Sequence, residues 1–269
     1  TALDENGTGT TDDEAASIDL NGDVVVDADI TLTTGNGTID FSDNVNSAAN
    51  ADNNLTIVSG TGTETFNDAI GTGTNGEIGT LTVNSAGAGD ITFATNADIG
   101  TTSAAGAARI LIGNGATGTL ALDAAEYFSS GGDATDAAQI YTANAFTMSG
   151  TDPDFHSAGT AAGISFVDGA TSDIVLSNSA DLTIQTNNGT IDIEPQIKGT
   201  GDDANTNVTL NAGTGNIVLD NTGGAVIGTD IGDVSLTGTT ITVSHNIVTD
   251  GGGIDVNGAF VLNLSLIHI

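Results

Sequence analysis

The chain is 269 residues long, contains no cysteine, and carries 35 acidic residues against two basic ones, for a formal net charge of −33. Nucleic acids and anionic membrane surfaces are bound through cationic side chains, so this composition excludes both as partners. Aromatic residues make up 4% of the chain and tryptophan is absent, so we expect many thin layers of small aliphatic side chains rather than one compact globular core. No stretch approaches the roughly 18 apolar residues that a membrane-spanning helix needs.

Residues 1–23 are acidic and rich in turn-forming residues, and we interpret them as a partial repeat or a linker. A three-residue pattern, aliphatic–Thr/Ser–aliphatic, then returns at nearly constant intervals. Its six copies lie in two groups: 30–32, 55–57 and 81–83, followed by 182–184, 208–210 and 234–236. Within each group one copy starts roughly 26 residues after the last, and a fixed period of this size is typical of a stacked array in which each repeat is one structural unit.

Most copies are followed by a polar stretch with glycine and then by a second pair of alternating apolar residues. Ile39-x-Phe41 follows Ile30-x-Leu32 in this way, and Ile217-x-Leu219 follows Val208-x-Leu210. Alternation places the aliphatic side chains on one face and Thr, Asp or Ser on the other, which predicts short half-buried strands. Asn and Gly tolerate positive φ, so tight turns are predicted at three places between the pairs. These turns lie at 35–37, 187–189 and 213–215.

Such turns could close antiparallel hairpins, or they could be the corners of a coil that always winds in one sense. The constant interval at which the pattern returns favours the coil. We therefore predict an all-β fold, a parallel β-helix (solenoid) with about 26 residues per coil, its neighbouring coils about 4.8 Å apart. The inner stacks would be Leu182/Val208/Val234 and Ile184/Leu210/Leu236. The alternative is an antiparallel β-sandwich or meander of repeats.

Solenoid repeats are predicted in two blocks, residues 24–122 and 164–263. Between them, residues 123–163 interrupt the rhythm with both tyrosines, three of the eight phenylalanines and the one methionine of the chain. This segment is either a loop that leaves the rod or a pair of irregular coils filled by larger side chains. Loops on rigid scaffolds carry recognition, and Tyr is a good contact residue. The segment therefore supplies the candidate ligand contacts: Tyr127, Phe128, Tyr141 and His156.

The last six residues, 264–269, differ in character from everything before them. Their sequence, Leu-Ser-Leu-Ile-His-Ile, resembles the translation of a sequencing-library adapter. We expect these residues to be an artefact and the natural chain to continue differently beyond Asn263. His268 is therefore given no functional role.

The acidic charge makes calcium the first candidate cofactor. Asp203, Asn205 and Asn207 offer oxygen ligands at alternate positions, which is a partial match to a calcium-binding loop. The glycine and the terminal bidentate glutamate of such a loop are missing. A turn rich in Asn and Asp is the alternative explanation. We therefore expect no cofactor and keep these three residues as the candidate calcium ligands.

Some parallel β-helices cleave acidic polysaccharides, and such sites need two or three carboxylates on one face. The compact acid–histidine cluster of this chain consists of Asp152, Asp154 and His156. The two basic residues, Arg109 and Lys198, are too few to attract an anionic glycan to a surface of net charge −33. We therefore expect no catalytic residue and no enzymatic activity, with a polysaccharide lyase or glycoside hydrolase as the alternative.

Two stretches, residues 181–193 and 208–219, resemble the repeat regions of filamentous-haemagglutinin-like large exoproteins, a family of β-strand-repeat adhesins of bacterial surfaces. The resemblance is one of pattern and composition and covers roughly residues 24–100 and 164–262. The Asn-Pro motifs of the family's secretion domain are not in this sequence, and no catalytic residue carries over. The resemblance implies a right-handed β-helix, an extracellular or cell-surface location, and adhesion to a glycan or protein of a host or neighbouring cell.

The sequence thus predicts a segment of a secreted or cell-surface bacterial protein that acts as a rigid stalk or adhesin. A calcium-stiffened adhesive repeat and a polysaccharide-degrading enzyme are the alternatives. Nucleic acid is not an expected partner, and insertion into a membrane is not expected. Because the terminal coils of a solenoid have bare edges, we also expect isolated chains to associate end to end.

Overall fold

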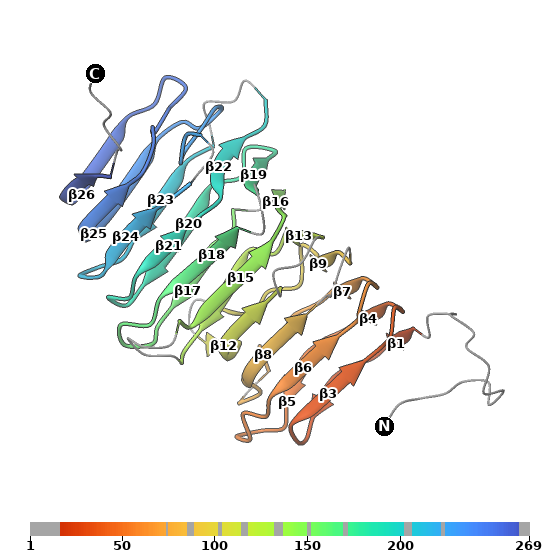
Figure 1. The fold of residues 1–269 in the computed structure, drawn as a ribbon. Helices are drawn as coiled ribbons and strands as arrows, with labels where there is room; N and C mark the ends of the chain where they lie inside the picture. The colour runs from red at the N-terminus through yellow and green to blue at the C-terminus, as the bar shows by residue number, and fades with distance from the viewer. Residues whose placement is uncertain are drawn as a thin grey trace.

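A computed structural model of the chain describes residues 17–73, 75–84, 89–101, 104–113, 118–131, 137–149, 152–168, 172–201, 206–221 and 224–263. These residues form strands and turns, and none of them belongs to a helix that could cross a membrane. The strands stack side by side into a β-solenoid (Figure 1). Their pairings are parallel except in one short hairpin of β10 (Gly100–Thr101) and β11 (Ala104–Ala105). The prediction of a parallel β-helix is confirmed, and an antiparallel sandwich or meander is excluded.

Each turn of the solenoid contributes to three faces. Face 1 is an eight-stranded sheet of β1 (Ile18–Leu20), β4 (Ile39–Phe41), β7 (Glu64–Phe66), β9 (Ile91–Phe93), β13 (Thr119–Leu122), β16 (Ala145–Ser149), β19 (Asp173–Ser177) and β22 (Gln196–Gly199). Face 2 consists of β2 (Val24–Val26), β5 (Val45–Ser47), β14 (Glu126–Ser129), β17 (Asp154–Ser157), β20 (Leu182–Thr186) and β23 (Val208–Asn211). Face 3 consists of β3 (Ile30–Thr33), β6 (Leu55–Val58), β8 (Ile78–Asn84), β12 (Ala107–Ile112), β15 (Gln139–Ala143), β18 (Ile164–Asp168), β21 (Ile191–Ile193) and β24 (Asn216–Leu219).

Two long strands close the C-terminal end of the solenoid. β25 (Val234–Val243) pairs with β23 through its first half and with β24 through its second half, so it runs along faces 2 and 3 in succession. β26 (Ile254–Leu262) pairs with both halves of β25. Apart from β2 and β5, which form a separate two-stranded sheet, the strands of the two faces thereby belong to a single 14-stranded sheet.

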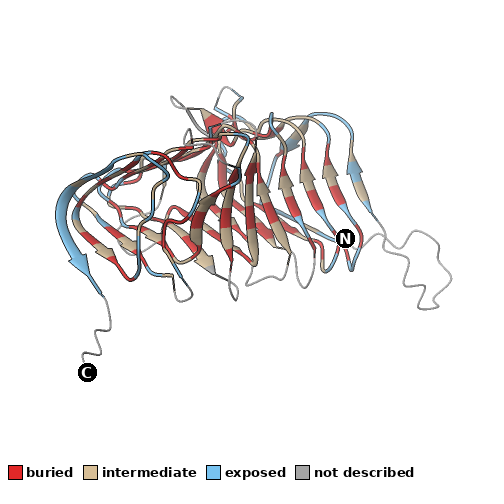
Figure 2. Cartoon of the chain, turned by 90° about the horizontal axis from the view of Figure 1, so that it is seen from above, coloured by how far each residue is buried: buried red, intermediate tan, exposed pale blue. Residues whose placement is uncertain are grey.

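The predicted inner stacks are confirmed. Each aliphatic residue of the second group of triplets pairs in register with its equivalent one turn later, and all six side chains are buried: Leu182, Val208, Val234, Ile184, Leu210 and Leu236. Buried residues occur along the strands of all three faces (Figure 2). The two groups of triplets lie on different faces, however. The first group forms β3, β6 and β8 on face 3, whereas the second forms β20, β23 and the start of β25 on face 2.

Residues 123–163 belong to the rod wherever the structure describes them. Their strands β14, β15, β16 and β17 pair in register with strands of adjoining turns. Their aromatic side chains fill the interior: Tyr127 stacks on Phe155 with ring centroids 4.5 Å apart, and Tyr141 stacks on Phe166 at 4.9 Å. Of the two alternatives for this segment, coils filled by larger side chains are therefore the one observed, and a loop that leaves the rod is not.

One corner of the solenoid is held by a chain of hydrogen bonds that we call the Asx ladder. The backbone N–H of Asp181 donates to Oδ1 of Asp152 (3.0 Å), and the N–H of Asn207 donates to Oδ1 of Asp181 (2.7 Å). The N–H of Asp233 then donates to Oδ1 of Asn207 (2.8 Å), and that of Gly253 to Oδ1 of Asp233 (2.7 Å). Each side chain thus binds the backbone of the next turn, and one continuous ladder spans five turns.

The same contact recurs at other corners. In the part of the chain that the structure describes, further Asp and Asn side chains accept a hydrogen bond from a backbone N–H one turn later: Asp29, Asn36, Asn46, Asn54, Asp90, Asp98, Asp123 and Asn188. A corner N–H has no strand partner, and leaving it unpaired inside the stack would cost free energy. These side chains supply the missing acceptor. The abundance of Asp and Asn in the composition therefore has a structural origin.

Among the described residues, one carboxyl group is fully buried in an otherwise apolar stack. Glu64 is fully buried and lies in register between Ile39 and Ile91. Its Oε1 accepts the N–H of Ser59 (3.2 Å), whereas its Oε2 has no hydrogen-bond partner among the described residues. Burial raises the pKa of Glu64 from 4.5 to about 7, and the hydrogen bonds from Ser59 oppose this rise only in part. Near neutral pH the N-terminal turns therefore contain a carboxyl group that is partly protonated.

The Asx ladder predicts a position-specific loss of stability. Asp181→Ala removes the acceptor of both the N–H and the Nδ2 of Asn207, and we expect it to lower the free energy of unfolding by about 1–2 kcal/mol. Asp181→Asn keeps an acceptor and is expected to restore most of the loss. Asp250→Ala removes the same charge from an exposed position and is the matched control. Denaturant unfolding of the three variants measures this, and equal stabilities of Asp181→Ala and Asp250→Ala would contradict it.

Glu64 predicts a pH dependence with a defined sign. Because its pKa is higher in the folded chain than in the unfolded chain, ionisation of Glu64 opposes folding. Below about pH 4.5 Glu64 is protonated in both the folded and the unfolded chain and does not change the free energy of unfolding. As the pH rises from there through 7, the free energy of unfolding falls by at most about 3 kcal/mol. We expect Glu64→Gln to flatten this part of the stability curve between pH 5 and 8, while Asp250→Asn leaves it unchanged. Thermal melts across this range test the prediction, and identical curves for Glu64→Gln and the native chain would refute it.

Candidate functional site

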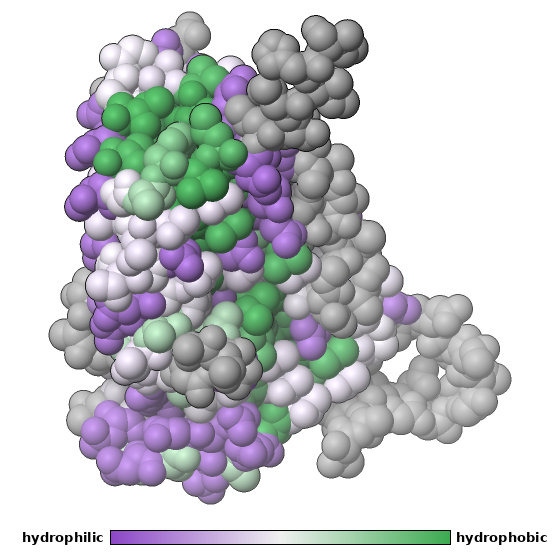
Figure 3. Space-filling view, turned by 60° about the vertical axis from the view of Figure 1, so that its left-hand side comes forward, coloured by the Kyte–Doolittle hydropathy of each residue, from purple (hydrophilic) through white to green (hydrophobic). Residues whose placement is uncertain are grey.

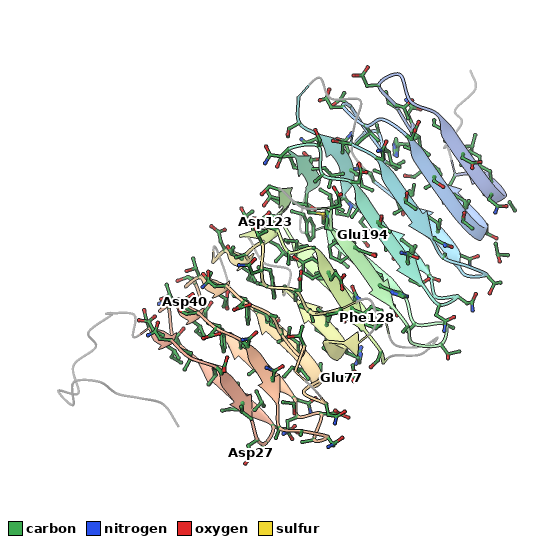
Figure 4. All side chains as sticks on the ribbon, turned by 180° about the vertical axis from the view of Figure 1, so that it is seen from behind. Asp27, Asp40, Glu77, Asp123, Phe128 and Glu194 are labelled. Atoms are coloured by element: carbon green, nitrogen blue, oxygen red, sulfur yellow. The ribbon has the colours of Figure 1, made fainter. Side chains whose placement is uncertain are left out.

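A group of chemically varied outward-facing side chains lies on face 2, on three neighbouring strands. Tyr127, Phe155 and Ile184 point into the core, so the residues beside them point outward. Two outward rows result, and the register pairs Glu126 with Asp154 and Thr183 in one row, and Phe128 with His156 and Gln185 in the other. We call Glu126, Phe128, Asp154, His156 and Gln185 the face-2 cluster. Figure 4 labels Phe128 in the middle of the rod.

The side chains of the face-2 cluster interact with one another, both within a row and between the two rows. The rings of Phe128 and His156 meet edge to face, with centroids 4.5 Å apart and an interplanar angle of 88°. Burial raises the pKa of Asp154, and the attraction of His156 and a hydrogen bond with Gln185 oppose this rise. Oδ1 of Asp154 is shielded from solvent and has no hydrogen-bond partner among the described residues. Asp154 is therefore a carboxyl group with a free acceptor and a weakened acidity.

The arrangement offers the elements of acid–base chemistry. Paired strands lie about 4.8 Å apart, so the in-register Glu126 and Asp154 project from neighbouring backbone positions. Retaining glycosidases hold their two carboxyl groups about 5 Å apart, one protonated and one ionised. A raised pKa suits Asp154 to the role of proton donor. Glu126 would be the second carboxyl group of the pair.

Both basic side chains lie on other faces and are already engaged. Nε and Nη2 of Arg109, on β12 of face 3, donate to the carbonyl oxygen of Ala137. Lys198, on β22 of face 1, forms an ion pair with Asp173 at 2.5 Å. The face-2 cluster thus has no lysine or arginine among its residues to hold an anionic substrate.

Two of the predicted ligand contacts are wrong. Tyr127 and Tyr141 are fully buried and form part of the aromatic core. Their hydroxyl groups are satisfied inside it, since Tyr141 donates to Oε1 of Gln139 (2.9 Å) and Tyr127 accepts the N–H of Ala124 (3.3 Å). Gln139 in turn donates to backbone carbonyl oxygens of β14 and β17. The tyrosines fill the wide turns of the rod and are closed to a ligand.

The other two predicted contacts, Phe128 and His156, belong to the face-2 cluster. His156 is half-buried, and Phe128 is 9% exposed. Asp152, which the sequence groups with Asp154 and His156, belongs to the Asx ladder instead, because its Oδ1 accepts the N–H of Asp181. The structure therefore separates the acid–histidine cluster into a ladder residue and a pair on the open face.

The predicted calcium ligands fall into two parts. Asp203 and Asn205 lie outside the described residues. Asn207 is a rung of the Asx ladder: its Oδ1 accepts the N–H of Asp233, and its Nδ2 donates to Asp181. Its side-chain oxygen is thus already used by the backbone of the next turn. Within the described part of the chain, no group of three His, Cys, Asp or Glu residues could hold a metal ion.

Acidic residues also gather on face 3. Burial raises the pKa of Asp192, and repulsion from Glu194 and Asp220 raises it further. Glu194 is labelled in Figure 4. The charges that act on Asp192 therefore have its own sign, so this group is a source of electrostatic repulsion.

A shallow depression of about 300 Å³ lies at the C-terminal end of face 2. Its lining includes the hydroxyl-bearing Thr209 and Ser235, the ladder residue Asp233, and Asp255. It continues the outward row that begins with Glu126, because the register runs from Thr183 through Thr209 and Ser235 to Asp255. This outward row of face 2 is therefore a regular series of hydrogen-bonding groups, with acidic residues at both of its ends.

Sequence reasoning missed Glu126 and Gln185. Glu126 lies one turn of the solenoid before Asp154, and Gln185 lies one turn after His156. Extending the repeat through residues 123–163 would have placed these side chains beside Asp154 and His156. The turns are slightly longer here than in the two repeat blocks, and the aromatic content of the segment obscured the extension.

Comparisons of the chain with protein-family models, with curated proteins and with solved structures find no match.

Calcium provides a direct test of the ligand prediction. Since Asn207 is engaged in the ladder, we expect Ca²⁺ to raise the melting temperature of the chain only as far as Mg²⁺ does at the same concentration. Both ions would then act by screening the charge of −33. Differential scanning fluorimetry with each ion measures the two shifts. A clearly larger shift with Ca²⁺, abolished by Asp203→Ala, would establish the calcium-stiffened alternative.

Proposed function

We propose that this chain is a segment of a rigid rod that serves as a stalk or adhesin of a secreted or cell-surface bacterial protein. The observation that carries the proposal is the continuous series of parallel strand pairings from β3 to β26, through which each turn stacks on the last. A stack of this kind resists bending, because bending would have to break ladders on one face. The resemblance of the repeats to large exoproteins supports export and adhesion.

The acidic surface supports the same proposal. A net charge of −33 keeps neighbouring rods apart in solution and repels nucleic acids and anionic glycans. The outward rows of face 2 offer hydroxyl, amide and carboxyl groups at the regular spacing of neighbouring strands. Neutral glycans and proteins are the partners that such a surface favours. We therefore propose that adhesion occurs on face 2 and that its ligand is a neutral glycan or a protein.

Adhesion can be tested with beads that carry the whole chain. We expect such beads to be retained under flow on surfaces coated with neutral polysaccharide or protein, and not on surfaces coated with polyanion. Asp154→Ala with Gln185→Ala should reduce retention several-fold, whereas the matched face-1 pair Asp173→Ala with Thr147→Ala should not. Retention on a polycation alone, lost on addition of salt, would show a charge effect without adhesion and would contradict the adhesive role.

The second candidate function is cleavage of a polysaccharide, and one observation favours it. Glu126 and Asp154 lie in register on neighbouring strands of one face, as a pair of catalytic carboxylates must. Against it, face 2 is an open surface, and both basic side chains lie on other faces. The proposed role as a stalk or adhesin needs no polysaccharide-cleaving activity.

The two functions are separated by an assay of reducing-end release from neutral and acidic polysaccharides. If the chain is a rod, the native protein releases no more ends than Asp154→Asn or Glu126→Gln does. Activity in the native chain that either substitution lowers by two or more orders of magnitude would establish the enzyme instead.

A further inference from the structure

Glu64 occupies a core position that isoleucine fills in the neighbouring turns. Hydrophilic residues are spread over the face of the molecule that Figure 3 shows, whereas Glu64 is fully buried. On β7 it lies in register between Ile39 of β4 and Ile91 of β9, and both of these side chains are buried. A carboxyl group therefore stands where the turns before and after place an aliphatic side chain.

The corner that precedes Glu64 repeats a turn found elsewhere in the rod. We call residues 59–63 the Ser59 corner. Oγ of Ser59 donates to the carbonyl oxygen of Gly62 (2.9 Å), and Glu64 lies five residues after Ser59. Two other corners have the same hydrogen bond, at 2.7 Å, but end in isoleucine: Thr34–Ile39 and Thr186–Ile191. The turn itself therefore does not require a carboxyl group.

The Ser59 corner binds the carboxyl group of Glu64 only in part. Oε1 accepts the N–H of Ser59 at 3.2 Å, and Oε2 has no hydrogen-bond partner among the described residues. The same N–H also donates to the carbonyl oxygen of Asn84 in the next turn, at 3.3 Å. One donor is thus shared between the carboxyl group and the ladder that joins this corner to the next turn.

The charged groups around Glu64 do not compensate a negative charge on it. The titratable side chains on the strands packed against it are Asp40 of β4 and Asp90, which precedes β9; both point outward and accept hydrogen bonds there. The two basic residues, Arg109 and Lys198, are bound on other turns. Burial, and not a neighbouring charge, raises the pKa of Glu64. Ionised Glu64 would therefore be a buried charge without a counter-ion, which is a costly state.

We propose that Glu64 is a pH-dependent switch of the Ser59 corner, which is closed while the carboxyl group is protonated and opens when it ionises. A neutral carboxyl group leaves the N–H of Ser59 to the carbonyl oxygen of Asn84. An ionised one attracts this N–H more strongly and needs water at Oε2. Water reaches Oε2 when residues 59–63 move away from the core.

The opening is local to this corner. Thr61 and Thr63 are exposed, so the corner can move outward while β6 and β7 stay paired with the strands of the next turn. The inference goes beyond the proposed stalk role and does not depend on adhesion.

The size of the effect follows from proton linkage. In the open corner Glu64 meets water and has the ordinary pKa of 4.5, whereas in the closed corner its pKa is about 7. The closed corner is therefore the one that holds the proton, and the equilibrium constant for opening rises between pH 4.5 and 7 and levels off above 7. Between pH 6 and 8 this increase is about tenfold.

Amide hydrogen exchange of the whole chain, followed by mass spectrometry between pH 5 and 8, tests the proposal. After correction for the intrinsic pH dependence of exchange, we expect the protection of residues 59–64 to fall about tenfold between pH 6 and 8. Glu64→Gln keeps the shape of the side chain, and Glu64→Ile copies the equivalent corners. Neither can ionise, so both should keep this protection constant.

Two controls separate the switch from a general effect of pH. Asp40→Asn removes an outward-facing carboxyl group from the neighbouring strand and should leave the pH dependence unchanged. Residues 186–191 form an equivalent corner without a carboxyl group at its end and should keep constant protection in the native chain.

The proposal is overturned if the protection of the Ser59 corner does not depend on pH, or if Asp40→Asn abolishes the dependence. It is also overturned if protection falls equally at residues 186–191, because the whole rod then unfolds rather than one corner. Circular dichroism shows whether each variant is folded, and Glu64→Ile decides the question if Glu64→Gln is not. A folded variant with the pH dependence of the native chain would likewise overturn the proposal.

Discussion

The hydrogen bond between one turn and the next is the interaction on which this structure depends. Strand ladders supply it along the three faces, and the side chains of Asp and Asn supply it at the corners, where no strand partner is present. In the Asx ladder the carboxyl or amide oxygen of one turn accepts the N–H of the following turn four times in succession. A chain without disulfides and with few aromatic residues is thereby held along its whole length by many small, equivalent contacts.

The hydrogen bonds at the corners give the acidic residues of the chain a structural role. Acidic side chains serve as structural acceptors at the corners, and the same groups give the surface its charge of −33. The two roles are in tension, because acceptors that stabilise neighbouring turns also repel each other. Asn207 relieves this tension within the Asx ladder, where it stands as a neutral rung between Asp181 and Asp233. Glycine contributes at the same corners. A Cβ atom on Gly215 would lie 2.1 Å from the carbonyl oxygen of Gly189, so neighbouring corners can stack this closely only with glycine.

The sequence was sufficient for the period, the parallel stacking and the inner residues of two faces. These follow from local alternation and from a fixed repeat, and both leave a direct trace in the order of residues. The assignment of the two groups of triplets to different faces was not predictable, because both groups have the same pattern and period. Tyr127 and Tyr141 were misjudged for a related reason. A turn wide enough to bury an aromatic ring differs from an exposed loop only in its pairing with neighbouring turns, and pairing is not visible in one turn alone.

The face-2 cluster shows the same limit. Its members come from three successive turns, and the sequence pointed to three of them: Phe128 on β14, and Asp154 and His156 on β17. Glu126 and Gln185 contribute through register, and the register here depends on turns slightly longer than those of the two repeat blocks. The adhesive proposal and the cleavage alternative assign different roles to the same outward-facing residues of face 2.

The central claim is the register between turns, and the absence of native cysteine allows a clean test of it. Thr183 and Thr209 are register partners on the outward side of β20 and β23, which places their Cα atoms within reach of a disulfide. Ser235 lies one turn further, beyond that reach. We predict that Thr183→Cys with Thr209→Cys forms an intramolecular disulfide under mild oxidation, seen by mass spectrometry of the digested chain, and that Thr183→Cys with Ser235→Cys does not. A disulfide in the second pair, or none in the first, would contradict the stacked parallel solenoid.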